Sequence, residues 1–206
     1  MYIPEFNRVE DRAVAVDFMR ANPFAILVSN IDGSPFATHL PLLVDEIGSE
    51  VIVRGHMAKA NPHWKSMLPG QESLVIFHGP HAYISPSLYE IHESVPTWNY
   101  AAVHVYGTMT LFTDEPHLYE TLNAMIHTFE AAYMTQWNSL GDDYQRRMLK
   151  HIVGFEMKVQ RLEAKFKLSQ NRTRTEQAQV IECLKRSPDS AVSGTADLMQ
   201  KQKLGR

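Results

Sequence analysis

In residues 54–64, RGHMAKANPHW, three basic side chains precede the expected start of a short helix. Arg54 and His56 close a predicted strand, Lys59 follows, and Asn61 precedes a proline, as is typical of a first helical turn. Unpaired backbone N–H groups and the helix dipole favour an anion there, and nearby cations add to this. The segment indicates a phosphate site, although a solvated basic turn is the simpler explanation of any single segment of this kind.

A second group of polar and aromatic residues lies near the middle of the chain. Thr97, Trp98, Asn99 and Tyr100 place a hydroxyl, an indole, an amide and a phenol at consecutive positions. Aromatic faces stack on a flat polar ring, and an amide recognises its edge. Judged by residue types alone, packing of these aromatic side chains into the core is the more common outcome.

Gln170 and Asn171 form a third polar cluster, just before a helix expected at 174–186. Their side chains suit the capping of that helix as well as they suit a binding role. A phosphate site together with a platform for a flat ring is what a mononucleotide such as a flavin requires.

The elements that must position these residues are mainly short strands separated by turns. Strands are expected at 24–29, 35–44, 51–56, 73–77, 82–85, 102–112 and 153–162. Helices are expected at 10–21, 61–68, 115–134, 143–150 and 174–186, with loops at 86–101 and 138–143, an irregular segment at 164–171 and a partly helical tail at 187–206. This order predicts a mainly β protein with flanking helices (α+β), built on an antiparallel barrel or sandwich.

Composition excludes several classes of protein. The 206 residues carry a net charge of −3, which argues against a surface made to bind nucleic acid or an acidic membrane. The single cysteine, Cys183, excludes an internal disulfide and a cysteine-based metal site. No acidic residue lies close to His78 and His81 to complete a metal site, so no metal is expected. No apolar run approaches membrane-spanning length, and we expect a cytoplasmic protein with no membrane partner.

The C-terminal residues 172–206 contain seven Lys or Arg against four Asp or Glu. A helix, a proline turn and a second helical segment match a helix-turn-helix only weakly. Any contact with DNA is therefore expected to be weak or indirect.

Seven ordered segments over most of the chain resemble one family, the PaiB-like FMN-binding negative transcriptional regulators. They are MYIP at 1–4, HLPLL at 39–43, RGHMAKANPHW at 54–64, GPHAYISPS at 79–87, VPTWNYAAVHVYG at 95–107, IVGFEM at 152–157 and KLSQNR at 167–172. That family is related to the FMN-binding split barrels, which include pyridoxamine-phosphate oxidase. The resemblance implies a six-stranded Greek-key split barrel that forms a homodimer, with FMN at the dimer interface.

The resemblance also implies which residues bind the cofactor. The residues implied to bind the phosphate are Arg54, His56, Lys59 and Asn61. The residues implied to line the flavin ring or the dimer interface are Thr97, Trp98, Asn99, Gln170 and Asn171. The implied domains are a split barrel with packing helices at 1–170 and a helical extension at 171–206.

Three functions remain open at this point. The resemblance favours a regulator that lowers the expression of sporulation or protease genes, with no catalytic residue assigned. The alternatives are an FMN-dependent oxidoreductase such as a flavin reductase, and a haem-binding split barrel, the latter because the chain has ten histidines.

Overall fold

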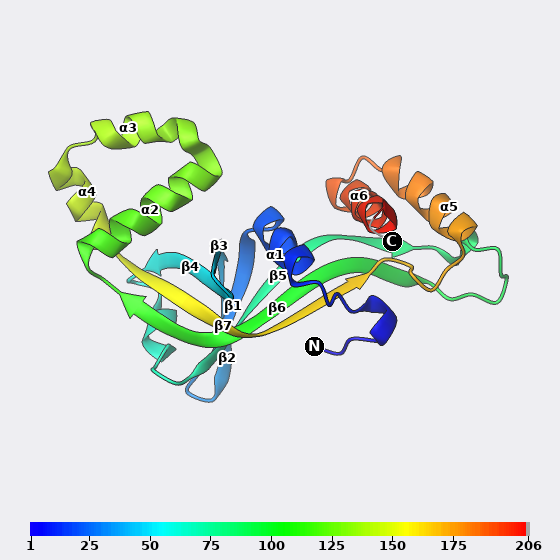
Figure 1. Ribbon diagram of the computed structural model, residues 1–206, viewed down its shortest axis with the longest axis horizontal. Helices are drawn as coiled ribbons and strands as arrows, with labels where there is room; N and C mark the ends of the chain where they lie inside the picture. Colours follow the sequence, from blue (N-terminus) through cyan, green and yellow to red (C-terminus); the bar gives the residue numbers. More distant parts are fainter. Residues whose placement is uncertain (205–206) are drawn as a thin grey trace. The chain divides into compact units, whose positions relative to one another are not determined.

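The structure, a computed structural model, describes residues 1–204 and divides into two compact units. The barrel unit comprises Met19–Phe77 and His104–Leu162, and the terminal unit comprises Met1–Phe18, His78–Val103 and Glu163–Arg206. Strands β5 (Glu72–Ile84), β6 (Thr97–Phe112) and β7 (Ile152–Lys167) contribute residues to both (Figure 1). The predicted division at residue 170 into a barrel and a helical extension stays a prediction.

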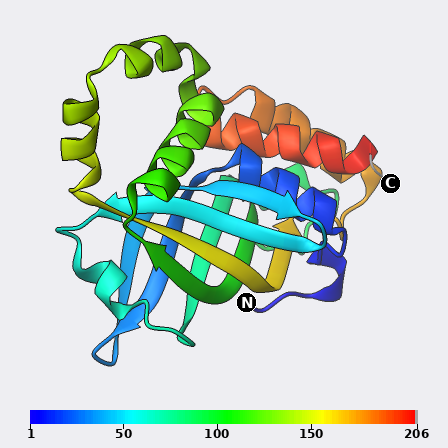
Figure 2. The same cartoon turned by 60° about the vertical axis from the view of Figure 1, so that its left-hand side comes forward.

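Strands β1 (Phe24–Ile31), β2 (Ser34–Pro41), β3 (Leu43–Ile47) and β4 (Glu50–Ala58) belong entirely to the barrel unit. With the three long strands they form one sheet in the order β2-β1-β5-β6-β7-β4-β3. The pairs β1–β2, β1–β5, β3–β4 and β4–β7 are antiparallel. Strand β2 also contacts β4 across this order, so the strands curl around a common interior (Figure 2).

Alternating side chains make β4 a strand with one face in the core. Val51, Val53, Gly55 and Met57 are buried, whereas the residues between them are half-buried. Gly55 has no room for a side chain, because a Cβ there would lie 2.7 Å from Leu42 Cδ2. The mainly β class with flanking helices is confirmed by this arrangement.

Several strand boundaries differ from the sequence-based predictions. The predicted strand at 35–44 is two strands, because Leu42 leaves the ladder and donates its N–H to the carbonyl of Pro23 at 2.9 Å. This break gives the sheet seven strands, where the family resemblance implied six. The strands predicted at 73–77 and 82–85 are one strand, β5, because the Gly79-Pro80 pair keeps an extended backbone that suits proline.

The second polar cluster and the first part of the segment 164–171 were predicted outside strands, and both predictions were wrong. Gln170 and Asn171 themselves lie in a turn, as predicted. Strand β6 already begins at Thr97, and β7 continues to Lys167. Buried small and polar residues such as Asn99 and Ala164 occupy the inward positions that larger apolar residues occupy elsewhere. The apolar signal of a strand is therefore weak in both segments.

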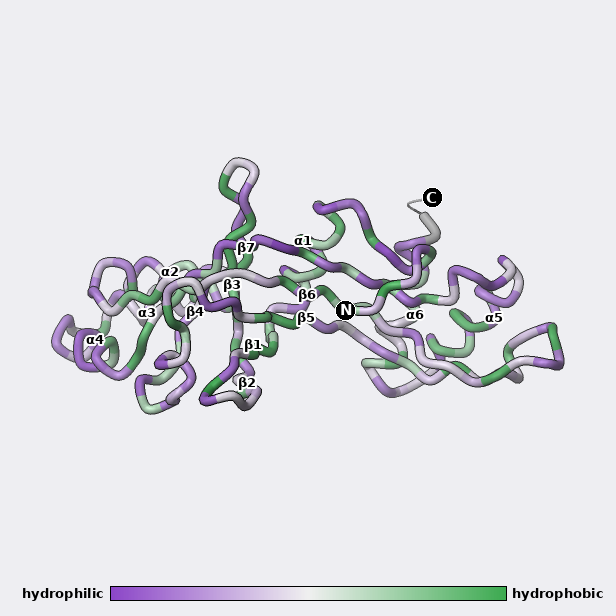
Figure 3. The backbone as a smooth tube through the Cα atoms, turned by 90° about the horizontal axis from the view of Figure 1, so that it is seen from below, coloured by the Kyte–Doolittle hydropathy of each residue, from purple (hydrophilic) through white to green (hydrophobic). Residues whose placement is uncertain are grey.

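Helix α1 (Arg12–Ala21) precedes the sheet, and a helical excursion lies between β6 and β7. It consists of α2 (Glu115–Glu130), η4 (Ala131–Tyr133), α3 (Met134–Ser139) and α4 (Asp142–Leu149). The loop predicted at 138–143 is thus partly helical. Trp137 holds this turn together. Its Nε1 donates to Asn123 Oδ1 at 2.9 Å, and its backbone carbonyl accepts from Gln145 Nε2 at 2.7 Å. Figure 3 shows α4 as mainly hydrophilic, in keeping with its exposed position.

In the terminal unit, short 3-10 helices η1 (Glu5–Asn7) and η3 (Pro86–Leu88) accompany α5 (Arg174–Lys185) and α6 (Ser190–Leu204). A capping box between Thr173 and Glu176 starts α5 where it was predicted. Buried Val180 and Leu184 lie on α5, and buried Ala196 and Met199 lie on α6, which packs against α5.

Two further findings concern the described residues as a whole. None of their helices is both long and apolar enough to cross a membrane. No group of three or more His, Cys, Asp or Glu side chains within residues 1–204 is placed to hold a metal ion.

Candidate functional site

The corner after β4 is held by backbone and amide hydrogen bonds. Lys59 N donates to the carbonyl of His151 at 2.8 Å, and Trp64 Nε1 donates to the carbonyl of Lys59 at 3.0 Å. Helix η2 (Pro62–Ser66) follows, and Asn61 caps it by accepting from His63 N at 3.0 Å. The predicted helix start is confirmed, but η2 is a five-residue 3-10 helix. Its dipole adds little to an anion site, and one of its free N–H groups already has a partner.

The two cations predicted to bind the phosphate, Arg54 and Lys59, differ in their partners. Arg54 donates from Nε to Asp45 Oδ2 at 2.7 Å and from Nη1 to Glu120 Oε1 at 3.3 Å, so two carboxylates already balance its charge. The ammonium of Lys59 is exposed and forms no ion pair within residues 1–204. Lys59 is therefore the better placed of the two cations to bind an added anion.

Two histidines flank the corner, and burial lowers the pKa of each. The Nδ1 atom of His56 is buried with no hydrogen-bond partner among the described residues. His63 is fully buried, and its Nδ1 lies 2.8 Å from Thr38 Oγ1, which also accepts from Asn61 Nδ2 at 3.1 Å. No local pattern predicted the hydrogen bonds that link His63 through Thr38 to Asn61, because Thr38 lies on another strand, β2.

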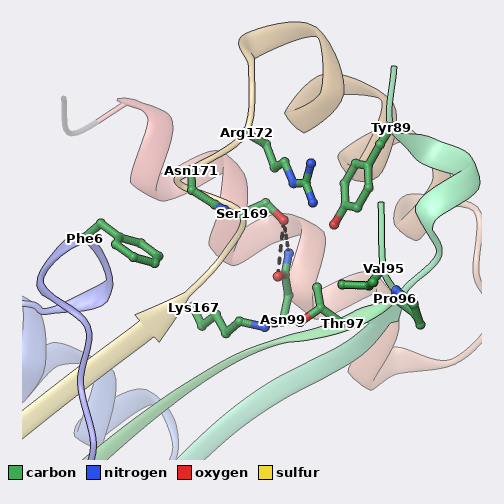
Figure 4. A pocket seen from close by; sticks show the side chains of 10 residues that line it. All are labelled: Phe6, Tyr89, Val95, Pro96, Thr97, Asn99, Lys167, Ser169, Asn171 and Arg172. Atoms are coloured by element: carbon green, nitrogen blue, oxygen red, sulfur yellow. Dashed lines mark hydrogen bonds between the residues drawn. The ribbon is translucent and has the colours of Figure 1, made fainter. Parts of the chain in front are cut away.

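The terminal unit contains a pocket of about 210 Å³ (Figure 4). Its walls are partly apolar, from Phe6, Val95 and Pro96. The remaining lining residues are polar: Tyr89, Thr97, Asn99, Lys167, Ser169, Asn171 and Arg172. Thr97, Asn99 and Asn171 were predicted as site residues, and the structure brings these three together.

The floor of this pocket is rigid. Asn99 is 1% exposed, and it exchanges two hydrogen bonds with Ser169, at 2.9 Å from Nδ2 and 3.2 Å to Oδ1. Asn99 Nδ2 also lies 3.5 Å from Met199 Sδ on α6. Ser169 has a φ of 62°, a left-handed conformation that is costly for a residue other than glycine. Strain of this kind is concentrated at functional sites.

Two cations face the pocket. Lys167 Nζ donates to Thr97 Oγ1 and, at 2.8 Å, to the carbonyl of Trp98. Burial lowers the pKa of Lys167, and the positive charge of Lys165 lowers it further. The guanidinium of Arg172 stacks on the ring of Tyr89, 3.7 Å from its centroid.

Two other predicted residues lie outside the pocket lining. Trp98 is 53% exposed, and its ring contacts those of His81 and Tyr83, each with centroids 6.0 Å apart. Gln170 bonds to its own segment, accepting from Leu168 N at 2.6 Å and donating to the carbonyl of Phe166. The remaining predicted residues, Arg54, His56, Lys59 and Asn61, belong to the barrel unit.

Sequence reasoning did not assign Tyr89, Lys167 or Arg172 to a site. The available signal was the KLSQNR segment at 167–172, which contains both cations next to the two predicted amides.

Comparison with known proteins settles the family. The family model described as "Putative FMN-binding domain" matches residues 1–161. The chain belongs to this FMN-binding family. Protease synthase and sporulation protein PAI 2 of Bacillus subtilis (strain 168) is 38% identical over 202 residues, 97% of each chain. The resemblance to the PaiB-like family is confirmed, and so is the prediction of FMN as its cofactor.

Solved structures share the fold at low sequence identity. The flavocytochrome Anf3 from Azotobacter vinelandii superposes with a TM-score of 0.62 at 15% identity, over 80% of this chain and 72% of its own. The FAD and heme binding protein from Mycobacterium smegmatis superposes with a TM-score of 0.60 at 14% identity, over 78% of this chain and 73% of its own. The fold is thus one that flavoproteins use.

Proposed function

We propose that this chain is a PaiB-like regulator that lowers gene expression, acts as a cytoplasmic homodimer and binds the phosphate of FMN at the corner after β4. The observation that carries the phosphate assignment is that Lys59 is exposed and forms no ion pair among the described residues. The Nδ1 atom of His56, three positions earlier, is buried without a hydrogen-bond partner among the same residues. When bound, FMN supplies one- and two-electron redox chemistry.

Within this corner, the residues have different proposed roles. Lys59 supplies the charge-assisted contact to the phosphate, and His56 supplies a second polar atom. Arg54, balanced by Asp45 and Glu120, lies in the middle of β4 and links that strand to β3 and α2. Asn61 holds the turn through its bonds to His63 and Thr38.

The flavin contacts predicted for Thr97, Trp98, Asn99, Gln170 and Asn171 stay a proposal. Asn99 and Gln170 already use their amides within the protein, so Asn171 is the most informative of the five to test. Titration of Asn171→Ala with FMN, monitored by the quenching of flavin fluorescence, should give a higher dissociation constant than titration of the wild type. An unchanged constant removes Asn171 from the flavin site.

We propose that regulation involves DNA weakly or indirectly. Exposed side chains of α6 include Ser190, Asp197 and Lys201, whereas Thr195 and Ala196 are fully buried. A helix that reads the major groove needs an exposed, basic or amide-bearing face. Tight, salt-sensitive gel shifts by the purified protein with a defined promoter would contradict this proposal.

The central experiment is an absorbance spectrum of the purified protein before and after addition of FMN, combined with light scattering for mass. We expect a bound-flavin spectrum after gel filtration and the mass of a dimer. Flavin that elutes freely from the protein, or a monomer, would overturn the corresponding part of the proposal.

An FMN-dependent oxidoreductase is the second candidate, because solved proteins that share this fold include a flavocytochrome. Oxidation of NADH or NADPH by the FMN-loaded protein would support it, and absence of turnover would exclude it for these donors. Haem addition in the same spectrometer tests the third candidate, since haem binding produces a Soret band.

A further inference from the structure

We propose that the pocket of the terminal unit binds a small aromatic carboxylate, held by Arg172 and Lys167. The site goes beyond flavin binding: its two cations lie outside residues 1–161, which the FMN-binding family model matches. All ten residues that line the pocket belong to the terminal unit, and three of them, Thr97, Asn99 and Asn171, are also proposed flavin contacts. The test below therefore compares the carboxylate with FMN directly.

Charge is the first reason. Of the ten lining residues, two are cationic and none is acidic. The Lys167 ammonium donates to a hydroxyl and a carbonyl, which leave its charge without a balancing carboxylate among these residues. An anion that enters this space gains charge-assisted hydrogen bonds and relieves the repulsion between Lys167 and Lys165.

Arg172 is held in a fixed plane, which favours a carboxylate. Its guanidinium stacks on Tyr89 and forms a long ion pair with the buried Glu176, whose Oε1 is 4.0 Å from Nη1. That distance exceeds a hydrogen bond, and the oxygens of Glu176 already accept from the backbone N–H groups of Glu90 and Thr173. The Arg172 donors therefore remain available, and their fork matches a planar carboxylate.

The apolar walls and the volume of the pocket indicate the size and the aromatic character of the ligand. Phe6 is 52% exposed and Val95 73%, so both offer apolar surface for a flat ring to cover. A cavity of about 150 Å³ can bind benzene, so a space of about 210 Å³ is enough for one small ring and its carboxylate.

The floor keeps this site in shape before any ligand arrives. The mutual hydrogen bonds of Asn99 and Ser169, and the contact of Asn99 with Met199, hold the strand ends together. A preformed site loses little entropy on binding, which allows a small ligand to bind specifically.

The test is calorimetric titration of the full-length protein with benzoate, with and without saturating FMN. Arg172→Gln and Lys167→Gln should each weaken benzoate binding by about ten- to a hundredfold, the effect of losing one charge-assisted contact. Lys185→Gln, which removes an exposed cation of α5 outside the pocket, should leave it unchanged. Arg172→Lys keeps the charge without the fork and should fall between wild type and Arg172→Gln.

Each remaining outcome decides the proposal. Absence of benzoate binding to a wild-type protein with a cooperative thermal transition would overturn it, as would equal binding by Lys185→Gln, Arg172→Gln and Lys167→Gln. Inorganic phosphate that binds as tightly as benzoate would overturn the assignment to a carboxylate with an aromatic ring. A parallel loss of FMN affinity in Arg172→Gln would assign the pocket to the flavin instead. Lys59→Ala should bind benzoate as tightly as wild type. Failure of the flavin proposal can therefore be distinguished from failure of the carboxylate proposal.

Discussion

At the scale of single residues, the partners of a cation decide what it is free to bind. Arg54 and Lys59 lie five positions apart in one basic segment, and they looked equally suited to a phosphate. In the folded chain Arg54 is engaged by two carboxylates, whereas Lys59 is exposed and makes no ion pair within the described residues. Removal of the two charges should therefore have different consequences.

Lys59→Ala should weaken FMN binding by about 1–3 kcal/mol, the usual contribution of a charge-assisted contact. Lys65→Ala is the matched control, because Lys65 is an exposed lysine of η2 in the same corner. Fluorescence titration with FMN measures both. Lys65→Ala should bind FMN as tightly as wild type. If Lys59→Ala does so too, Lys59 is not a phosphate ligand.

At the scale of elements, close approach of strands fixes where a side chain is tolerated. A Cβ at Gly107 of β6 would lie 2.2 Å from the carbonyl oxygen of Lys158 on β7. Gly107→Ala should lower the free energy of unfolding by about 1–3 kcal/mol or more, since the backbone must shift. Gly141→Ala is the control, with no atom within 4 Å of its Cβ. Denaturant unfolding compares the two, and equal midpoints would refute the packing argument.

Helix α2 begins with a pair that titrates. Asp114 caps the helix and its Oδ2 lies 2.9 Å from His117 Nδ1. The hydrogen bond lowers the pKa of Asp114 and raises the pKa of His117. The Asp114 contribution is lost as pH falls through its lowered pKa, and the His117 contribution is lost as pH rises through its raised pKa.

The pair should therefore stabilise α2 most at mildly acidic pH, where both groups are charged. His117→Gln should lower the melting temperature more at about pH 5.5 than at about pH 8. Scanning calorimetry at both pH values measures the difference, with His127→Gln at the other end of α2 as the control. A larger effect at the higher pH would contradict the assignment.

At the scale of the whole molecule, the half-buried imidazole of His56 and the fully buried imidazole of His63 couple folding to pH. Burial lowers the pKa of His56 and His63, so the unfolded chain takes up protons first as pH falls below about 6.5. The free energy of unfolding should therefore decrease from about pH 6.5 toward the lowered pKa values, and be insensitive to these groups above that range. Urea unfolding across this range measures the slope, and His63→Gln should reduce it. A slope that is the same in wild type and His63→Gln would exclude His63 as its source.

The sequence by itself determined the family, the cofactor, the mainly β class and the helix start at Asn61. These follow from local patterns: strand alternation, a proline at a first turn and ordered motifs that keep their chemistry wherever the chain runs. Only the tertiary structure decided that Arg54 is balanced by Asp45 and Glu120, and that Lys167 and Arg172 line one pocket with Asn99. Such pairings join residues distant in the chain, and burial and hydrogen bonding set them, so no local pattern contains them.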